Sequence, residues 1–121
     1  MESNADLMKM LVTDFYERLL NDNSISFRFD DILAHDLESH LHTIADFWES
    51  LLFGVSKYKN NAMVPHLTLH EKDPFMVHDF ETWLKHWRDA VHVHLKGELA
   101  STAIFRAESI ANLMKHKMNI V

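Results

Sequence analysis

The sequence contains no cysteine. This absence excludes disulfides, thiolate metal ligands, cysteine nucleophiles and covalent cofactor attachment through a C-x-x-C-H motif. Glycine and proline are scarce, with two of each, so the chain has too few turn residues for many short strands. Lysine and arginine (12) are outnumbered by aspartate and glutamate (18), for a formal net charge of −6. This balance opposes nucleic-acid binding, which depends on cationic contacts to phosphate.

Long apolar runs are also missing. No stretch approaches the roughly 20 apolar residues that a membrane-spanning helix needs. The first ten residues, MESNADLMKM, carry acidic and polar side chains where a signal peptide has basic residues followed by an apolar run. We therefore expect no membrane association and a cytoplasmic location. With 121 residues and 47% hydrophobic content, the chain is expected to form one domain over residues 1–121. We also expect a monomer, because the interior takes up the methionine and aromatic side chains and leaves no obvious stripe for an interface.

Residues of high helix propensity dominate the periodic segments, and no stretch sustains two-residue alternation, so the predicted fold class is all-α. Four long helices are expected, over residues 4–20, 36–53, 75–96 and 98–117, and helical spacing places Leu113 on the inward face of the last one. The connector 25–33 is expected to hold a helical turn or two. Gly54 lies where a left-handed helix cap would be, and Gly97 is expected to separate the last two helices.

The predicted structure is built around the stretch 37–54, LESHLHTIADFWESLLFG. At helical spacing one face carries an apolar stripe, with the imidazole of His40 near its N-terminal end. The stripe consists of His40, Ile44, Phe47, Trp48 and Leu51. The opposite face is expected to carry Glu38, Asp46 and Glu49. The plain explanation is a core helix whose histidine hydrogen-bonds to a neighbour. The alternative is a helix that lies against a flat ligand.

Ten histidines in 121 residues suggest metal or cofactor binding, because neutral imidazole is a common metal ligand. His66 and His70 could share one helix face, but the sequence singles out no third ligand for zinc, and H-E-x-x-H is absent. Nucleophile-elbow, phosphate-loop and dinucleotide motifs are absent as well. A histidine-rich, haem-free helical protein that binds zinc or nickel remains an alternative.

Haem binding fits the residues better. Haem is a flat apolar disc with charged edges, so it needs facing apolar and aromatic helix surfaces and one neutral imidazole for its iron. His66 lies in the short apolar segment 62–69, where a ligand can be placed independently of the long helices. The stripe with His40 and Trp48 would cover the other side of the ring.

Five motifs spread over the chain then show a family resemblance: DFYERL (14–19), SFRFDDIL (26–33), HLHTIADFWESLLFG (40–54), PHLTL (65–69) and FETWLKHW (80–87). Together they resemble the truncated haemoglobins, and within these the third group. The scarcity of glycine fits that group as well. The implied fold is a shortened globin, in which two helix pairs cross over the haem, a two-over-two arrangement.

The resemblance implies a role for each matching position. His66 matches the proximal iron ligand, and Tyr16, His40 and Trp83 match the distal polar residues. The apolar residues that surround the haem are matched by Phe29, Ile44, Phe47 and Trp48. The implied cofactor is non-covalently held haem b. Packing alone is the other explanation for Tyr16 and Trp83, since both lie on apolar stripes.

The expected ligands are diatomic (O2, NO or CO), or peroxide. A bound diatomic ligand gathers partial negative charge, so donors such as the Tyr16 hydroxyl and the Trp83 indole should slow its release. Nitric oxide dioxygenation or peroxide cleavage would need a separate reductase, because the sequence holds no flavin or nicotinamide motif. A ligand-binding or sensing module without turnover is the alternative.

Overall fold

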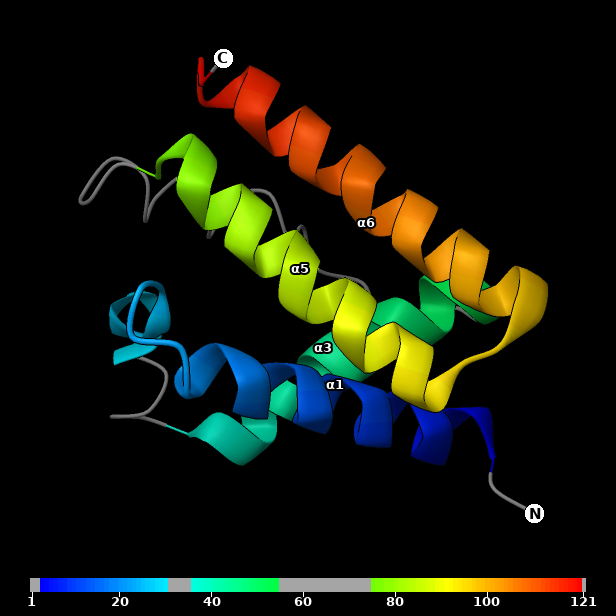
Figure 1. Cartoon of the computed structure of the whole chain (residues 1–121). Coiled ribbons are helices and arrows are strands. Elements are labelled where there is room, and N and C mark those ends of the chain that lie inside the picture. Colours follow the sequence, from blue (N-terminus) through cyan, green and yellow to red (C-terminus); the bar gives the residue numbers. More distant parts are fainter. Residues whose placement is uncertain (1–2, 31–35, 55–74, 121) are drawn as a thin grey trace.

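The computed structural model describes residues 3–30, 36–54 and 75–120 (Figure 1). Its elements are α1 (Asn4–Leu20), the 3-10 helix η1 (Ser26–Phe29), α3 (Leu37–Phe53), α5 (Val77–His94) and α6 (Gly97–Lys117). Within these ranges every regular secondary-structure element is a helix, which confirms the all-α prediction. None of the described helices combines the length and the apolar character that a membrane span requires.

Helix α1 has the bounds that its caps and spacing predict. The Ser3 hydroxyl oxygen accepts a hydrogen bond from the Asp6 N–H at 3.1 Å, which satisfies one of the free donors of the first turn. Beyond Leu20 the chain turns away at Asn21, the C-cap residue. The buried face is formed by Met8, Leu11, Val12, Phe15, Tyr16 and Leu19.

Helix α3 is capped at both ends by local chemistry. The Asp36 carboxylate accepts from the Ser39 N–H at 3.1 Å, and Gly54 takes the expected left-handed conformation with φ +71°. One prediction for this helix is wrong: Glu49 was expected to face away from the core but is only 7% exposed. The reason is that Glu49 follows Trp48 at the edge of a second stripe, with Leu41 and Ala45, that is buried as well.

The last two helices differ slightly from the expected bounds. The helix expected over 75–96 is Val77–His94, because the Asp79 carboxylate accepts from the Met76 N–H at 2.8 Å and so caps the helix there. The last helix begins at Gly97 instead of residue 98. Leu113, which spacing placed inward, is 50% exposed. The buried stripe of α6 is instead formed by Ala100, Ala103, Ala107, Ala111 and Met114.

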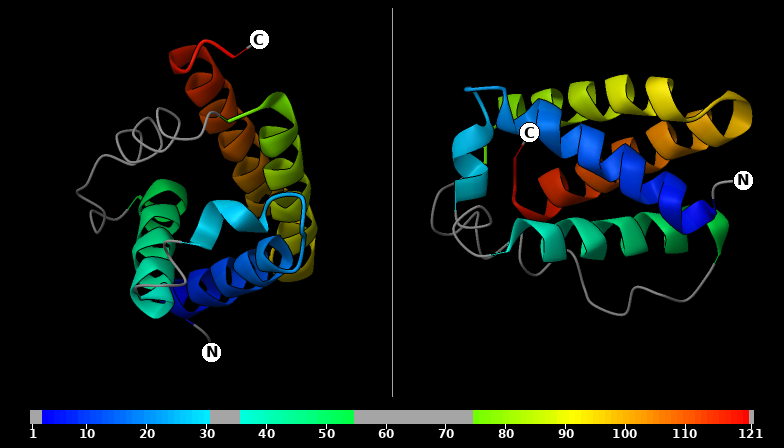
Figure 2. Two further views of the ribbon diagram at one scale, coloured as in Figure 1. Left: turned by 90° about the vertical axis from the view of Figure 1, so that its left-hand side faces the viewer. Right: turned by 90° about the horizontal axis from the view of Figure 1, so that it is seen from below.

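The helices form two pairs. Helices α5 and α6 run antiparallel side by side (Figure 1). The small alanine side chains in the buried stripe of α6 permit this close approach. Helix α1 crosses α3 and also packs against α5, which joins the two pairs (Figure 2). Trp87 is fully buried at this junction, stacked on Trp48 with ring centroids 4.2 Å apart. The arrangement is the expected two-over-two globin architecture.

Candidate functional site

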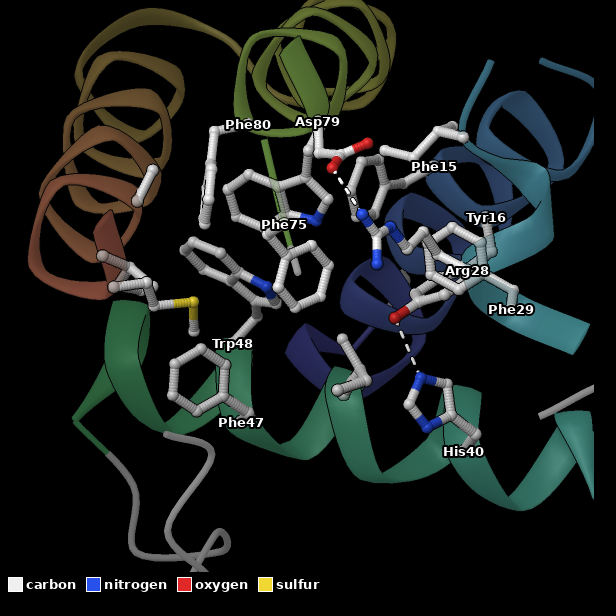
Figure 3. A pocket seen from close by; sticks show the side chains of 16 residues that line it. Phe15, Tyr16, Arg28, Phe29, His40, Phe47, Trp48, Phe75, Asp79 and Phe80 are labelled. Atoms are coloured by element: carbon white, nitrogen blue, oxygen red, sulfur yellow. Dashed lines mark hydrogen bonds and ion pairs between the residues drawn. The ribbon is translucent and has the colours of Figure 1, made fainter. Parts of the chain in front are cut away.

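A cavity of about 230 Å³ lies between the two helix pairs. It is bounded by α1, the η1 segment, α3, α5 and α6, so every described element contributes to its wall. The lining is mostly aromatic and aliphatic and consists of Phe15, Tyr16, Ile25, Arg28, Phe29, His40, Ile44, Phe47, Trp48, Phe75, Asp79, Phe80, Trp83, Ile110, Ala111 and Met114. Figure 3 shows the side chains of this cavity.

The structure brings seven of the eight predicted site residues to this one cavity: Tyr16, Phe29, His40, Ile44, Phe47, Trp48 and Trp83. The eighth, His66, lies outside the described residues. Helix α3 explains why four of the seven meet here. Helix α3 packs on α1, and Leu41 and Ala45 belong to its buried stripe, whereas the neighbouring stripe lines the cavity. The half-buried state of Ile44 and Phe47 follows from that orientation.

Tyr16 and His40 form a hydrogen-bonded pair at the polar side of the cavity. The Tyr16 Oη lies 2.8 Å from the His40 Nε2, and the two rings meet edge to face at 86° (Figure 3). The Tyr16 ring is fixed by Phe15 and Phe29, with ring centroids 5.4 and 5.5 Å away. Burial raises the pKa of Tyr16 well above its usual range. The tyrosine therefore keeps its proton and acts as a neutral hydrogen-bonding group.

Trp83 reaches the same cavity from α5. Its ring packs edge-on against Phe15 at a centroid distance of 5.7 Å. Within the described ranges its indole N–H makes no hydrogen bond, so it is a donor without a protein acceptor there. Trp87, one turn along, has a different role: its N–H donates to the Ala103 carbonyl at 3.1 Å, which joins α5 to α6. Trp83 therefore lines the cavity, whereas Trp87 belongs to the core.

An ion pair in the cavity wall was missed from the sequence. The Arg28 guanidinium lies 2.8 Å from the Asp79 carboxylate, and these side chains are only 5% and 8% exposed. The guanidinium also lies over the rings of Phe27 and Phe75, at 4.9 and 4.4 Å from their centroids. The signal in the sequence was weak: a single arginine between two phenylalanines in a short connector.

Two other histidines of the unusually large set lie outside the cavity, at the seam between α1 and α5. His86 Nε2 is 2.7 Å from Asp22, and His94 Nε2 is 2.8 Å from Asp14. The hydrogen bonds from His86 and Ser24 lower the pKa of Asp22 to about 2. Burial raises the pKa of Asp14, but hydrogen bonds from Arg18 and His94 outweigh it and lower the net value. Over the described residues, no three metal-ligating side chains converge.

The cavity suits a flat apolar cofactor such as haem. Aromatic rings and aliphatic side chains from five elements surround it, and the few polar groups gather on one side, where Tyr16, His40 and Arg28 lie (Figure 3). Phe47, Trp48 and Phe80 lie toward the other side of the view. A porphyrin needs such apolar walls, and a ligand at its iron needs a few donors near it. The described residues meet both requirements.

Comparison with known proteins agrees with this geometry. Residues 4–119 match the model of a family described as bacterial-like globin. A group 3 truncated haemoglobin of Campylobacter jejuni is 28% identical over 114 residues, which cover 92% of this chain and 84% of that protein. The crystal structure of a group III truncated haemoglobin from Campylobacter jejuni superposes with a TM-score of 0.85 at 25% identity, covering 97% of this chain and 92% of that one.

Proposed function

The chain belongs to the bacterial-like globin family, and from this premise we propose that it holds haem b in the cavity and binds O2, NO or CO beside Tyr16. Haem binding and the binding of a diatomic gas follow from the family itself. The predicted resemblance to the group III truncated haemoglobins is confirmed by the matches. The haem type, the particular ligands and the residue roles are the proposal.

The choice of haem b rests on the sequence. With no cysteine in the chain, thioether attachment of the porphyrin is excluded, so a non-covalent haem is the simplest cofactor. His66 is proposed as the proximal ligand on the strength of the PHLTL motif, and it lies outside the described residues. The haem supplies an iron at which a diatomic ligand binds, and the protein supplies the walls and the donors.

One observation carries the ligand-binding proposal: the Tyr16 hydroxyl is held in the cavity wall at 2.8 Å from the His40 Nε2. The hydroxyl has one hydrogen, so its direction depends on the tautomer of the imidazole. When Nε2 carries a proton, His40 donates to the tyrosine oxygen, and the tyrosine hydrogen is available to the cavity. When Nε2 is bare, the tyrosine donates to it.

A ligand with partial negative charge selects the first arrangement, because it accepts the tyrosine hydrogen while His40 supports the tyrosine oxygen. Hydrogen bonds in such a chain strengthen one another. The indole N–H of Trp83, which has no protein acceptor within the described ranges, is proposed as a second donor. Slow release of O2 is the expected result.

The test is an absorption spectrum of the purified protein loaded with haem, followed by addition of CO and of O2 to the reduced form. A Soret band at one haem per chain, which shifts with either gas, is expected. A pyridine haemochrome spectrum identifies the haem as type b. A protein that takes up no haem under these conditions would refute the proposal and would favour the haem-free, histidine-rich alternative.

A redox role is the second proposal, since donors beside the ligand also suit nitric oxide dioxygenation or peroxide cleavage. The sequence holds no flavin or nicotinamide motif, so electrons would come from a separate reductase. Turnover of NO or peroxide with an added reductant distinguishes this role from a ligand-binding or sensing module, which binds reversibly without turnover.

We further propose that the protein is a single-domain monomer located in the cytoplasm. Size-exclusion chromatography with light scattering tests the monomeric state, and cell fractionation tests the location.

A further inference from the structure

Trp48 and Trp87 form a stacked pair of indoles at the wall of the cavity. Their ring planes differ by 24°, and their ring centroids are 4.2 Å apart. Trp48 lines the cavity from α3 (Figure 3), whereas Trp87 is on α5 and does not line it. The pair therefore extends from the surface of the cavity into the core. Both side chains are buried, with exposed fractions of 2% and 0%.

Three rings that can give up an electron line the cavity within the described residues: Tyr16, Trp48 and Trp83. Trp83 has one ring contact in the described ranges, edge-on with Phe15 at 5.7 Å, so no second indole overlaps it. Oxidation of a phenol requires the loss of its proton, and burial raises the pKa of Tyr16. Of the three rings, Trp48 is the one with a second indole stacked on its face.

We propose that the stacked indoles of Trp48 and Trp87 are a one-electron donor for peroxide cleavage at the haem. The inference rests on the redox role proposed above, because it requires haem in the cavity and peroxide as the oxidant. Trp48 lines the cavity and is the inner member of the pair. Trp87 lies outside the cavity and is the outer member, which takes part of the positive charge away from the cofactor.

The electrons and atoms of the reaction balance with peroxide as the oxidant. Cleavage of one hydrogen peroxide breaks the O–O bond and forms two waters, which consumes two electrons and two protons. The indole pair supplies one electron and becomes a radical cation. The second electron comes from the iron, which is the redox chemistry that the haem supplies when bound. The protons come from water, and one-electron transfers from the separate reductase restore the indole pair and the iron.

Two features of the pair stabilise a positive charge that burial otherwise disfavours. Overlap of two stacked rings spreads the charge over both indoles. The Trp87 N–H donates to the Ala103 carbonyl at 3.1 Å, and a hydrogen bond from a charged donor is about twice as strong as one from a neutral donor. A carbonyl oxygen does not take up the indole proton, so the oxidised pair keeps it. The product is therefore a radical cation and not a neutral radical.

The main experiment is high-field electron paramagnetic resonance of the ferric, haem-loaded protein, frozen rapidly after mixing with hydrogen peroxide. A tryptophan radical is expected. Its spectrum should narrow when the protein is produced with ring-deuterated tryptophan and should be unchanged with ring-deuterated tyrosine. Proton electron–nuclear double resonance should detect the retained indole N–H.

Three variants separate the stacked pair from packing. Trp87→Phe leaves the lining of the cavity intact and removes the outer indole, and Trp48→Phe removes the inner one; both should lose the radical signal. Repeated additions of peroxide should also bleach their Soret bands faster than that of the wild type. Val91→Ala is the control, because Val91 is fully buried one turn after Trp87 and does not line the cavity. It loosens the same part of the core, keeps both indoles and should keep the signal.

Survival of the wild-type signal in either tryptophan variant, or its loss in Val91→Ala, would overturn the inference. So would a tyrosine radical in the wild type, which would place the donor at Tyr16 with its proton passed to His40, 2.8 Å away. If Trp87→Phe takes up no haem, Trp48→Phe decides the question. A wild type that consumes peroxide without a protein radical overturns the inference alone. A wild type that binds haem and consumes no peroxide removes the redox role, and one without a Soret band removes haem binding; the inference falls with either.

Discussion

Replacing Tyr16 by phenylalanine removes a single oxygen atom from the cavity wall and leaves the ring in place between Phe15 and Phe29. The side chain is 7% exposed, so water cannot readily take over the role of the hydroxyl. A hydrogen bond to an acceptor with partial charge contributes roughly 1.5–3 kcal/mol. At about 1.4 kcal/mol per factor of ten, its loss corresponds to about ten- to a hundredfold faster O2 release.

The geometry favours the lower end of this range for the single variant. His40 Nε2 is the hydrogen-bond partner of the hydroxyl at 2.8 Å, so its N–H can turn to the ligand once the hydroxyl is gone. Trp83 offers a further donor from α5. We therefore expect about tenfold for Tyr16→Phe and about a hundredfold for Tyr16→Phe/His40→Leu.

The assay is stopped-flow displacement of O2 by CO from the ferrous protein. CO dissociation serves as the internal control, because CO carries little negative charge and should be much less sensitive to the hydroxyl. An O2 release rate that stays within about twofold of the wild type would remove Tyr16 from the donor role. Equal acceleration of O2 and CO release would point to a loosened cavity instead of a lost hydrogen bond.

Four further predictions concern the iron ligand, the core, a cap and the acid response. His66→Ala should lose the iron–imidazole signature in the Soret region; a wild-type spectrum would assign the iron ligand to another residue. Trp87→Phe should lower the free energy of unfolding by about 2–3 kcal/mol, measured by urea denaturation, because it removes a fully buried indole and its bond to a carbonyl. Gly54→Ala should cost about 1 kcal/mol from backbone strain alone in the same assay, since φ is +71° and an added Cβ would meet no atom within 4 Å. Asp22, with its pKa lowered from 3.8 to about 2, contributes stability that is fully present above about pH 4 and is lost as the pH falls toward 2; Asp22→Asn should lack this part of the acid transition in thermal melts, and an identical pH profile would contradict the assignment.

Helix positions followed from the sequence because their causes are local. The bounds of α1 are those predicted from Ser3, from the four-residue spacing of its apolar side chains and from the turn residues after Leu20. Gly54 was predicted to be left-handed for the same kind of reason and is so. The predictions that were wrong concern which face of a helix is buried. Periodicity shows that a helix has an apolar side, but it does not show how far the buried surface extends when two neighbours contact the helix. Glu49 and Leu113 were misplaced for this reason.

For the cavity too, some features could be predicted from the sequence and others depend on the tertiary structure. The sequence alone determined the helical class, the absence of thiol chemistry and, through motif resemblance, seven of the aromatic, aliphatic and polar residues that line one cavity. The tertiary structure alone decided which of those residues touch: Tyr16 meets His40 across 24 positions, and Arg28 meets Asp79 across 51. Pairing over such separations depends on the crossing of α1 with α3 and on the packing of η1 near the start of α5. These arrangements come from the sum of many weak contacts throughout the core, and no short stretch of sequence encodes them.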